Sequence, residues 1–440
     1  MGTNGNGNAP KGTFFARGWL MVGIAFVVAI VTQGFGLYSL SMIRGALGEV
    51  LGATATQMSL CWTFYVLALA FVGLFVGNFI DKFGIRASLI VAAVLFAGGF
   101  VMVSFSISLA FLYLSYIVMG AGSAFGGVII ITGIPANWFV KKRGLANGFI
   151  WSATFFGSLF VSNFCAAIIS AGDWHVAVWA LAAIAFAVLF AASFILKWRP
   201  QDVGLYPDGI TEEEMSQVSA ELAGSARVVG LTRAEALKSP TFWILFAGIF
   251  FIGIGEMGPF QNMTTFIVSR GNDLATAAMF MSLIGTVGFF GKVLSGWVID
   301  KIGARNAFAI IMALAIAGLV MLMFSSADSG MLYMYIAVAL FGVSENASIV
   351  CFSASTGKFL GAKHYAQIFG VIFVAKALGD SVGAPLLAAV SATALGWTGS
   401  FGIAAAVCAI SAIIFWFAKK DKKLEQLEQD AMRELQAETR

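Results

Sequence analysis

The amino-acid sequence predicts an all-α polytopic membrane protein with twelve transmembrane helices in two six-helix halves. Three observations support this prediction. Hydrophobic residues make up 60% of the 440 residues and charged residues only 11%, whereas a soluble domain is about 25% charged. The apolar runs are long enough to cross a bilayer, which takes about 20 mostly apolar residues. A charged turn also occurs twice, once in each half of the chain.

The apolar segments divide the chain into five parts. We expect spans at residues 19–43, 56–79, 87–106, 109–135, 145–170, 174–196, 241–267, 276–299, 306–325, 331–356, 365–393 and 398–418. The parts are a polar N-terminus (1–18), a first six-helix half (19–197), a connector (198–238), a second six-helix half (239–418) and a charged tail (419–440).

The repeated turn has the pattern G-x-x-x-D-K-x-G-x-R. Its first copy comprises Gly77, Asp81, Lys82 and Arg86. Its second copy begins 219 residues later and comprises Gly296, Asp300, Lys301 and Arg305. A repeat at half of the chain length indicates two similar units. The charges can pair with each other and with helix ends, so we interpret both turns as latches that release during a conformational change.

Basic residues predict the orientation, because cytoplasmic loops are rich in Lys and Arg. If both termini are cytoplasmic, 22 of the 26 Lys and Arg residues lie on the cytoplasmic side. Lys292 and Lys376 lie inside spans, and only Arg44 and Arg270 fall on the outer side. We therefore expect a multi-pass protein of the cytoplasmic (inner) membrane. The net charge of +4 then reflects topology and does not indicate nucleic-acid binding.

The first half is nearly free of charge within the membrane. Its first span contains Gln33 and Tyr38, whose polar groups need a partner or a water-filled cavity in hydrocarbon. We take both as candidate substrate contacts. We interpret Gly34 and Gly36, which lie between them, as positions of close helix packing.

Five charged residues lie within the spans of the second half: Glu256, Lys292, Glu345, Lys376 and Asp380. Each costs roughly 2.5–3.5 kcal/mol near the bilayer centre, so packing alone does not explain them. Lys376 and Asp380 are four residues apart on one helical face and can neutralise each other. Two cations still face three acids, so neutralisation is incomplete.

The lysines and the acids suit different roles. Two intramembrane ammonium groups attract an anion, so Lys292 and Lys376 are candidate substrate ligands. A carboxyl group that changes environment can gain and lose a proton, so Asp380, Glu256 and Glu345 are candidates for proton coupling or charge pairing. Asp380 is the first candidate for proton coupling, because Lys376 is the nearest cation along its helix.

The two halves with their repeated turns resemble the major facilitator superfamily over nearly the whole chain. Within it, the segment NWFVKKRGLANG, from Asn137 to Gly148, is similar to the oxalate:formate antiporter and monocarboxylate transporter families. In the antiporter family a basic residue on the eighth span and a lysine on the eleventh bind the substrate carboxylate. Lys292 and Lys376 fall at those positions, so the resemblance implies transport of a small carboxylate.

The chain departs from the antiporter family in three ways. The eighth-span position is Lys292 where the family has arginine, and lysine lacks the bidentate fork. Glu256, Glu345 and Asp380 are additional acids. The fourth span offers only Phe125 where the family has a tyrosine. The resemblance therefore leaves open which acid is carried, and whether transport is anion exchange or proton symport.

Four functional classes remain to be compared. The leading one is a secondary active transporter that moves a small mono- or dicarboxylate through a site between two rocking half-bundles. The alternative is a cation or drug–proton antiporter whose surplus acids bind the ligand. A sensor would need a large soluble output domain, for which the 41-residue connector is too short. The sequence contains no H-E-x-x-H, G-x-S-x-G or P-loop motif, so an enzyme is not expected.

The expected partners follow from this interpretation. They are a small organic acid, protons or a counter-transported anion, and the lipid bilayer, with the protein acting as a monomer. No cofactor or metal is expected, because the four cysteines have no paired spacing.

Overall fold

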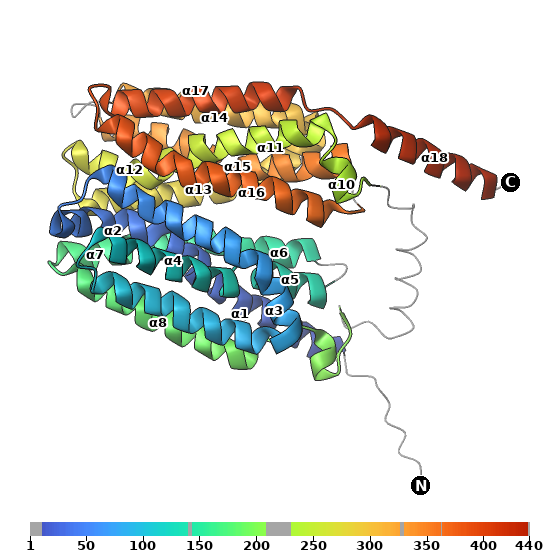
Figure 1. The fold of residues 1–440 in the computed structure, drawn as a ribbon, viewed down its shortest axis with the longest axis horizontal. Helices are drawn as coiled ribbons and strands as arrows, with labels where there is room; N and C mark the ends of the chain where they lie inside the picture. The colour runs from blue at the N-terminus through green and yellow to red at the C-terminus, as the bar shows by residue number, and fades with distance from the viewer. Residues whose placement is uncertain (1–10, 140–142, 208–229, 326–329, 362, 439–440) are drawn as a thin grey trace, which may run out of the picture.

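The helices run alongside one another in two groups (Figure 1). The computed structural model describes residues 11–139, 143–207, 230–325, 330–361 and 363–438. Residues 140–142, in the middle of the segment that resembles the monocarboxylate transporter families, lie outside the described residues.

The first group, which we call the N-half, begins with a span that contains a π-helical turn. This span comprises α1 (Lys11–Ala29), η1 (Ile30–Phe35) and α2 (Gly36–Leu51). The other helices are α3 (Ala55–Ser104), α4 (Leu109–Gly126), α5 (Val128–Trp138), α6 (Arg143–Trp151), α7 (Ala153–Ser170) and α8 (Trp174–Ile195).

The second group, the C-half, begins in the same way. Its first span comprises α11 (Pro240–Ile252), the π-helical turn η4 (Gly253–Met257) and α12 (Gly258–Ser269). The other helices are α13 (Leu274–Ile302), α14 (Ala304–Met323), α15 (Met331–Leu360), α16 (Tyr365–Ser391) and α17 (Gly396–Trp416). π-Helical turns are frequent at functional sites, and here they occupy equivalent places in both halves.

The repeated turn makes the same bend in each half. Gly84 has φ 81° and ψ 165°, and Gly303 has φ 82° and ψ 156°. Each is the glycine of a D-K-x-G sequence, and glycine adopts positive φ without steric cost. The first bend lies inside α3, which therefore contains two of the predicted spans. The described residues form eleven apolar helices long enough to cross a membrane, and the double length of α3 completes the twelve predicted crossings.

The charged side chains of these turns contact rings and helix ends rather than each other. The Arg86 guanidinium lies 4.4 Å from the centroid of the Phe194 ring. Arg305 donates a hydrogen bond of 2.7 Å to the Ala418 carbonyl. Among the described residues, Asp81 forms no ion pair. The role of the turns as conformational latches remains a prediction.

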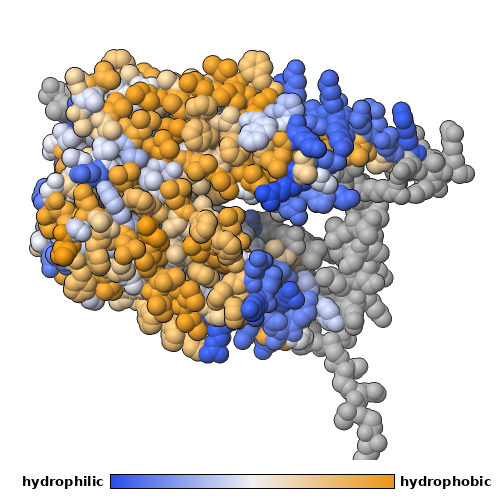
Figure 2. All heavy atoms as spheres, viewed as in Figure 1, coloured by the Kyte–Doolittle hydropathy of each residue, from blue (hydrophilic) through white to orange (hydrophobic). Residues whose placement is uncertain are grey.

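The two ends of the bundle differ. We call the end where the described parts of the connector lie the connector end, and the opposite end, with loops 52–54 and 270–273, the far end. Hydrophilic residues gather at the connector end, and Figure 2 shows the surface hollowed there between the two halves. The halves are joined instead in the middle of the bundle and toward the far end.

Hydrogen bonds between the halves show where they meet. Asn163 of α7 donates to the Ser282 hydroxyl of α13 at 2.8 Å, and the Thr63 hydroxyl of α3 donates to the Ser381 carbonyl of α16. Arg44 of α2 donates to Asn262 of α12 at 2.9 Å. The bundle is therefore closed at the far end.

The position of Arg44 corrects the sequence interpretation, which placed this residue outside the first span. The helix continues to Leu51, and Arg44 is buried within it, with only 3% of its surface exposed. A hydropathy pattern sets the end of a span at the first charged residue. The backbone hydrogen bonds of a helix do not depend on the side chain, so the helix can continue past that charge. The amide of Asn262 supplies a partner in the opposite half that the sequence pattern does not show.

The last part of the connector is attached to the C-half. Leu231 donates its backbone N–H to the Leu360 carbonyl at 3.0 Å, and Glu235 of α10 (Arg233–Ala236) pairs with Lys423 of α18 (Lys422–Glu438) at 2.5 Å. The hydrogen bond from Lys423 lowers the pKa of Glu235 to about 2. Both side chains are partly exposed, so this pair contributes little stability. The backbone contacts indicate that this part of the connector moves with the C-half.

Closure of the far end depends on a glycine in the interface between the halves. A Cβ on Gly285 of α13 would fall 1.8 Å from the Ser158 hydroxyl of α7. We expect Gly285→Ala to force the halves apart, because such overpacking costs about 1–3 kcal/mol, or about 5- to 150-fold in the equilibrium. Labelling of Ser282→Cys, a buried position of the same interface, by an impermeant maleimide added at the far end should accelerate accordingly. Gly23→Ala is the matched control, since its Cβ would meet nothing within 4 Å; equal labelling in both variants would contradict this prediction.

Candidate functional site

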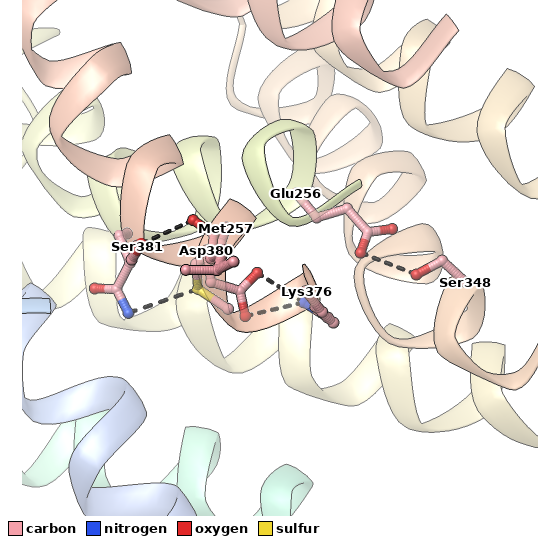
Figure 3. Close-up of polar contacts among 8 residues, drawn as sticks. Glu256, Met257, Ser348, Lys376, Asp380 and Ser381 are labelled. Atoms are coloured by element: carbon pink, nitrogen blue, oxygen red, sulfur yellow. Dashed lines mark hydrogen bonds and ion pairs between the residues drawn. The ribbon is translucent and has the colours of Figure 1, made fainter. Parts of the chain in front are cut away.

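Three intramembrane charges of the C-half, Glu256, Lys376 and Asp380, lie within or beside the π-helical turn η4 (Figure 3). Lys376 and Asp380 lie one turn apart on α16, and the Lys376 ammonium donates to both carboxylate oxygens of Asp380, at 2.8 and 3.2 Å. Both side chains are 12% exposed. The two residues thus face each other on one helix as an ion pair.

Close helix packing brings α16 against η4. A Cβ on Gly253 would lie 2.7 Å from the Lys376 carbonyl oxygen and 2.8 Å from the Asp380 backbone nitrogen. On the other side, a Cβ on Gly379 would lie 2.1 Å from the Phe250 carbonyl oxygen. Only glycine fits at these two positions, since any side chain would have to displace backbone. The two glycines thus place the Lys376–Asp380 pair next to the turn that carries Glu256.

Glu256 is fully buried and has no cation as a direct partner among the described residues. Its Oε2 accepts a hydrogen bond of 2.9 Å from the Ser348 hydroxyl of α15. Its Oε1 has no hydrogen-bond partner. In Figure 3 the Glu256 carboxyl group points to Ser348 and away from the Lys376–Asp380 pair. A buried carboxylate left half-satisfied is costly, so this group is a candidate for carrying a proton.

Two further charges come from α13 and α15. The Lys292 ammonium lies 5.8 Å from the centroid of the Trp151 ring, which belongs to α6 of the N-half. Glu345 lies one turn before Ser348 on α15 and is buried. Lys292 is close enough to interact electrostatically with Glu345 and with Lys376.

The five charges therefore form one electrostatic group rather than separate sites. Lys376 interacts with Glu256 and Glu345 as well as with Asp380. The group comes from the first, second, fourth and fifth spans of the C-half. Each charge in a low-dielectric interior acts strongly on the others, so adding an anion or a proton at one member alters the energy of all of them.

Tyr38 of the N-half faces this group. Its ring packs edge-to-face on Phe260 of α12, with centroids 5.5 Å apart. Its hydroxyl lies beside Ser158 and within the electrostatic reach of Glu345. The structure thus brings Tyr38 to the interface where Lys292 and Glu345 lie, as a substrate contact would require.

Gln33 is placed differently. It lies in η1, and its side-chain amide nitrogen is buried without a hydrogen-bond partner. A Cβ on Gly127 would lie 3.2 Å from that nitrogen, so Gln33 faces the junction of α4 and α5 inside the N-half. The neighbouring Gly34 packs as expected, since its Cβ would lie 2.8 Å from the Gly157 Cα. The described contacts do not join Gln33 to the charged group.

Sequence reasoning missed three residues that complete the site. Ser348 holds Glu256, Trp151 lies under Lys292, and Ser158 lies beside Tyr38. Ser348 follows Glu345 by three residues, which places the two on one face of a helix, and this spacing was the only available signal. Trp151 and Ser158 belong to the opposite half, and no local pattern connects them to their partners.

A comparison with known proteins identifies the family. The family model of the Major Facilitator Superfamily matches residues 24–384. The chain belongs to this superfamily. It is a multi-pass membrane transporter that works by alternating access, and its family and fold are not those of enzymes.

Individual relatives of this superfamily member are distant but cover most of its length. The oxalate:formate antiporter of Oxalobacter formigenes is 22% identical over 392 residues, which span 88% of each chain. Monocarboxylate transporter 12 of Xenopus laevis is 23% identical over 355 residues, covering 78% of this chain and 76% of the relative. The crystal structure of a D-xylose-proton symporter has a TM-score of 0.73 at 16% identity and covers 92% of this chain and 99% of its own. That structure supports the fold alone.

Proposed function

We propose that this protein is a secondary active transporter of small organic anions, either mono- or dicarboxylates. The observation that carries the proposal is the position of Lys292 and Lys376. They come from two different helices of the C-half and interact electrostatically, and Tyr38 of the N-half reaches the same region through Ser158 and Glu345. Two ammonium groups at the junction of two half-bundles form a site for a carboxylate.

Two distant relatives support the same substrate class. One is an oxalate:formate antiporter and the other a monocarboxylate transporter. The three acids of the site suggest how transport of the anion is coupled to protons or to a second anion. Asp380, Glu256 and Glu345 either exchange protons with the substrate anion in a symport cycle or balance the lysines during anion exchange. The transporter then acts as a monomer in the cytoplasmic membrane.

A cation or drug–proton antiporter is the second candidate function. The observation that favours it is the surplus of acid, because within the described part of the chain Glu256 has no cation as a direct partner and its Oε1 has no hydrogen-bond partner. A positively charged ligand would satisfy that oxygen. The two proposals differ in the sign of the charge that is carried, so a transport assay distinguishes them.

Uptake into proteoliposomes tests the proposal. A panel of radiolabelled formate, lactate, oxalate and succinate is supplied with and without an imposed pH gradient, and with each unlabelled acid inside. We expect at least one acid to accumulate above protein-free vesicles. Accumulation that requires the pH gradient indicates symport, and accumulation that requires internal acid indicates exchange. A protein that transports none of the acids but exchanges protons for a lipophilic cation would favour the second candidate.

The proposed orientation places the connector end in the cytoplasm and the far end outside, as the distribution of basic residues predicts. Ser269→Cys at the far end and Gln201→Cys in the connector are both exposed positions. The four native cysteines are buried, so they contribute little background. An impermeant thiol reagent added to intact cells should label the first variant only. Labelling of the second variant instead would invert the topology.

A further inference from the structure

Arg44 is a buried cation that the proposed site does not use. It lies on α2 with 3% of its surface exposed, and its Nη1 donates to the Asn262 side-chain oxygen of α12 at 2.9 Å. This hydrogen bond crosses the interface between the halves in the closed region near the far end. An intramembrane arginine is expensive and usually functional, so its partners need to be accounted for.

The guanidinium is only partly satisfied. Its Nε and Nη2 atoms are buried without a hydrogen-bond partner, and no carboxylate of the described residues lies within 4 Å of it. These two nitrogens form one edge of the planar group and present two parallel N–H donors. That edge is the one that binds a carboxylate in a bidentate manner. The contact with Asn262 occupies Nη1 and leaves this edge without a partner.

Among the residues that the structure describes, no counter-ion pairs with Arg44. The groups within its electrostatic reach are the Cys61 thiol of α3 and the Tyr116 phenol of α4, both neutral. Asn262 donates through its amide nitrogen to the Gly258 and Ala384 carbonyls, at 2.8 and 3.0 Å. These bonds set the amide so that its oxygen faces Arg44. A carboxylate at position 262 would neutralise the arginine permanently, whereas an amide holds it and leaves its charge available.

Arg44 lies at the interface between the halves, on the far-end side of the charged group. Asn262 contacts Ala384, which follows Asp380 by one turn and Lys376 by two turns on α16, or about 6 and 12 Å along the helix axis. Seven residues before Arg44 on α2, the Leu37 carbonyl accepts a hydrogen bond from Gln261 of the C-half. Seven residues make about two turns, so Arg44 lies on the face of α2 that meets the C-half. Separation of the halves at the far end therefore exposes it.

We propose that the Nε–Nη2 edge of Arg44 is a second carboxylate-binding subsite, which an organic anion occupies on the far-end side before it reaches Lys376 and Lys292. This inference rests on the proposed function, since it concerns the same substrate class. In the closed state Asn262 holds Nη1. When the far end opens, Asn262 withdraws with the C-half and the guanidinium edge faces the incoming carboxylate.

The test compares uptake through the two faces of the membrane. Right-side-out and inverted vesicles are supplied with whichever of formate, lactate, oxalate and succinate the wild-type protein takes up fastest. We expect Arg44→Gln to raise the KM for uptake through the far-end face about 10- to 150-fold, the effect of losing a charge-assisted contact. The KM for uptake through the connector-end face should stay at the wild-type value. Arg44→Lys retains the charge without the fork and should give an intermediate KM at the far-end face.

Asn262→Ala is the matched control. It removes the hydrogen bond across the halves but leaves the free edge of Arg44 intact, so the KM at the far-end face should not rise. If Arg44 serves only to hold the halves together, Asn262→Ala will reproduce the effect of Arg44→Gln, and that result would overturn the subsite. An unchanged far-end KM in both Arg44 variants would overturn it as well.

Failure of the subsite can be told apart from failure of the proposed function. If wild-type vesicles take up none of the four acids above protein-free vesicles, the carboxylate function itself fails, and the subsite with it. If wild-type vesicles transport an acid and the Arg44 variants match them, only the subsite fails. Should Arg44→Gln not reach the membrane, Arg44→Lys decides the question, because it keeps the buried charge and changes only the geometry of its donors.

Discussion

Neutral replacement of either site lysine is expected to weaken binding of the organic acid at least about tenfold. The low local dielectric strengthens the attraction between an ammonium and a carboxylate. Losing one such charge-assisted contact should cost about 1.5–3 kcal/mol, or about 10- to 150-fold in affinity. We expect this loss for Lys292→Gln and for Lys376→Gln, measured as acid binding to detergent-purified protein.

The two lysines should differ in what else their replacement disturbs. Lys376→Gln leaves Asp380 buried without its cation, and removing one partner of a buried pair is destabilising. The double variant Lys376→Gln/Asp380→Asn removes both charges and should restore membrane levels without restoring binding. Lys292 contacts the Trp151 ring and forms no ion pair within the described part of the chain, so its replacement should disturb the protein less.

Replacing each lysine by arginine, which keeps the charge, tests the same prediction more specifically. Lys292→Arg should retain part of the function, because the antiporter family that the chain resembles carries arginine there. Lys376→Arg should retain less, since a planar fork has to fit beside Asp380 at the position where the ammonium now donates at 2.8 Å. Lys358→Gln, an exposed lysine of α15, is the control. Lysine variants that bind the acid as tightly as this control would remove the anion site and favour the cation antiporter.

Replacing the acids is expected to uncouple transport from protons. Asp380 ranks first from the sequence, because Lys376 is its neighbour. The structure shows that this proximity is an ion pair, and it shows Glu256 accepting a hydrogen bond from the Ser348 hydroxyl. A proton relieves the cost of burying an unpaired carboxylate, so Glu256 joins Asp380 as a leading candidate. Glu256→Gln or Asp380→Asn should abolish accumulation driven by a pH gradient but spare exchange of internal for external acid.

The measurement distinguishes acids that couple transport to protons from acids that only balance the charge of the lysines. Accumulation is followed in proteoliposomes with an imposed pH gradient, and exchange is followed in the same vesicles without one. Glu425→Gln, an exposed residue of α18, should leave both unchanged. If the triple replacement of Glu256, Glu345 and Asp380 by amides leaves pH-driven accumulation intact, the acids only balance the lysines and the protein does not couple to protons through them.

Features that depend on neighbours along one helix followed from the sequence alone. The apolar runs indicated the crossings, and the repeated charged turn marked the two places where the structure bends at Gly84 and at Gly303. The Lys376–Asp380 pair was predictable for the same reason, since residues four apart on a helix share a face whatever surrounds it. These are consequences of chain chemistry and helical period.

Contacts between helices were decided only by the tertiary structure. The partners of Glu256, Lys292 and Arg44 lie 92, 141 and 218 residues away along the chain, at Ser348, Trp151 and Asn262. Which residues meet depends on how each helix is rotated and on how closely two backbones approach, as where Gly253 lies against α16. Arg44 shows most clearly what the sequence pattern alone does not predict. A charge at the end of an apolar run indicates the end of a span, unless an amide in the other half of the protein supplies its partner, and only the packing of the two halves reveals that amide.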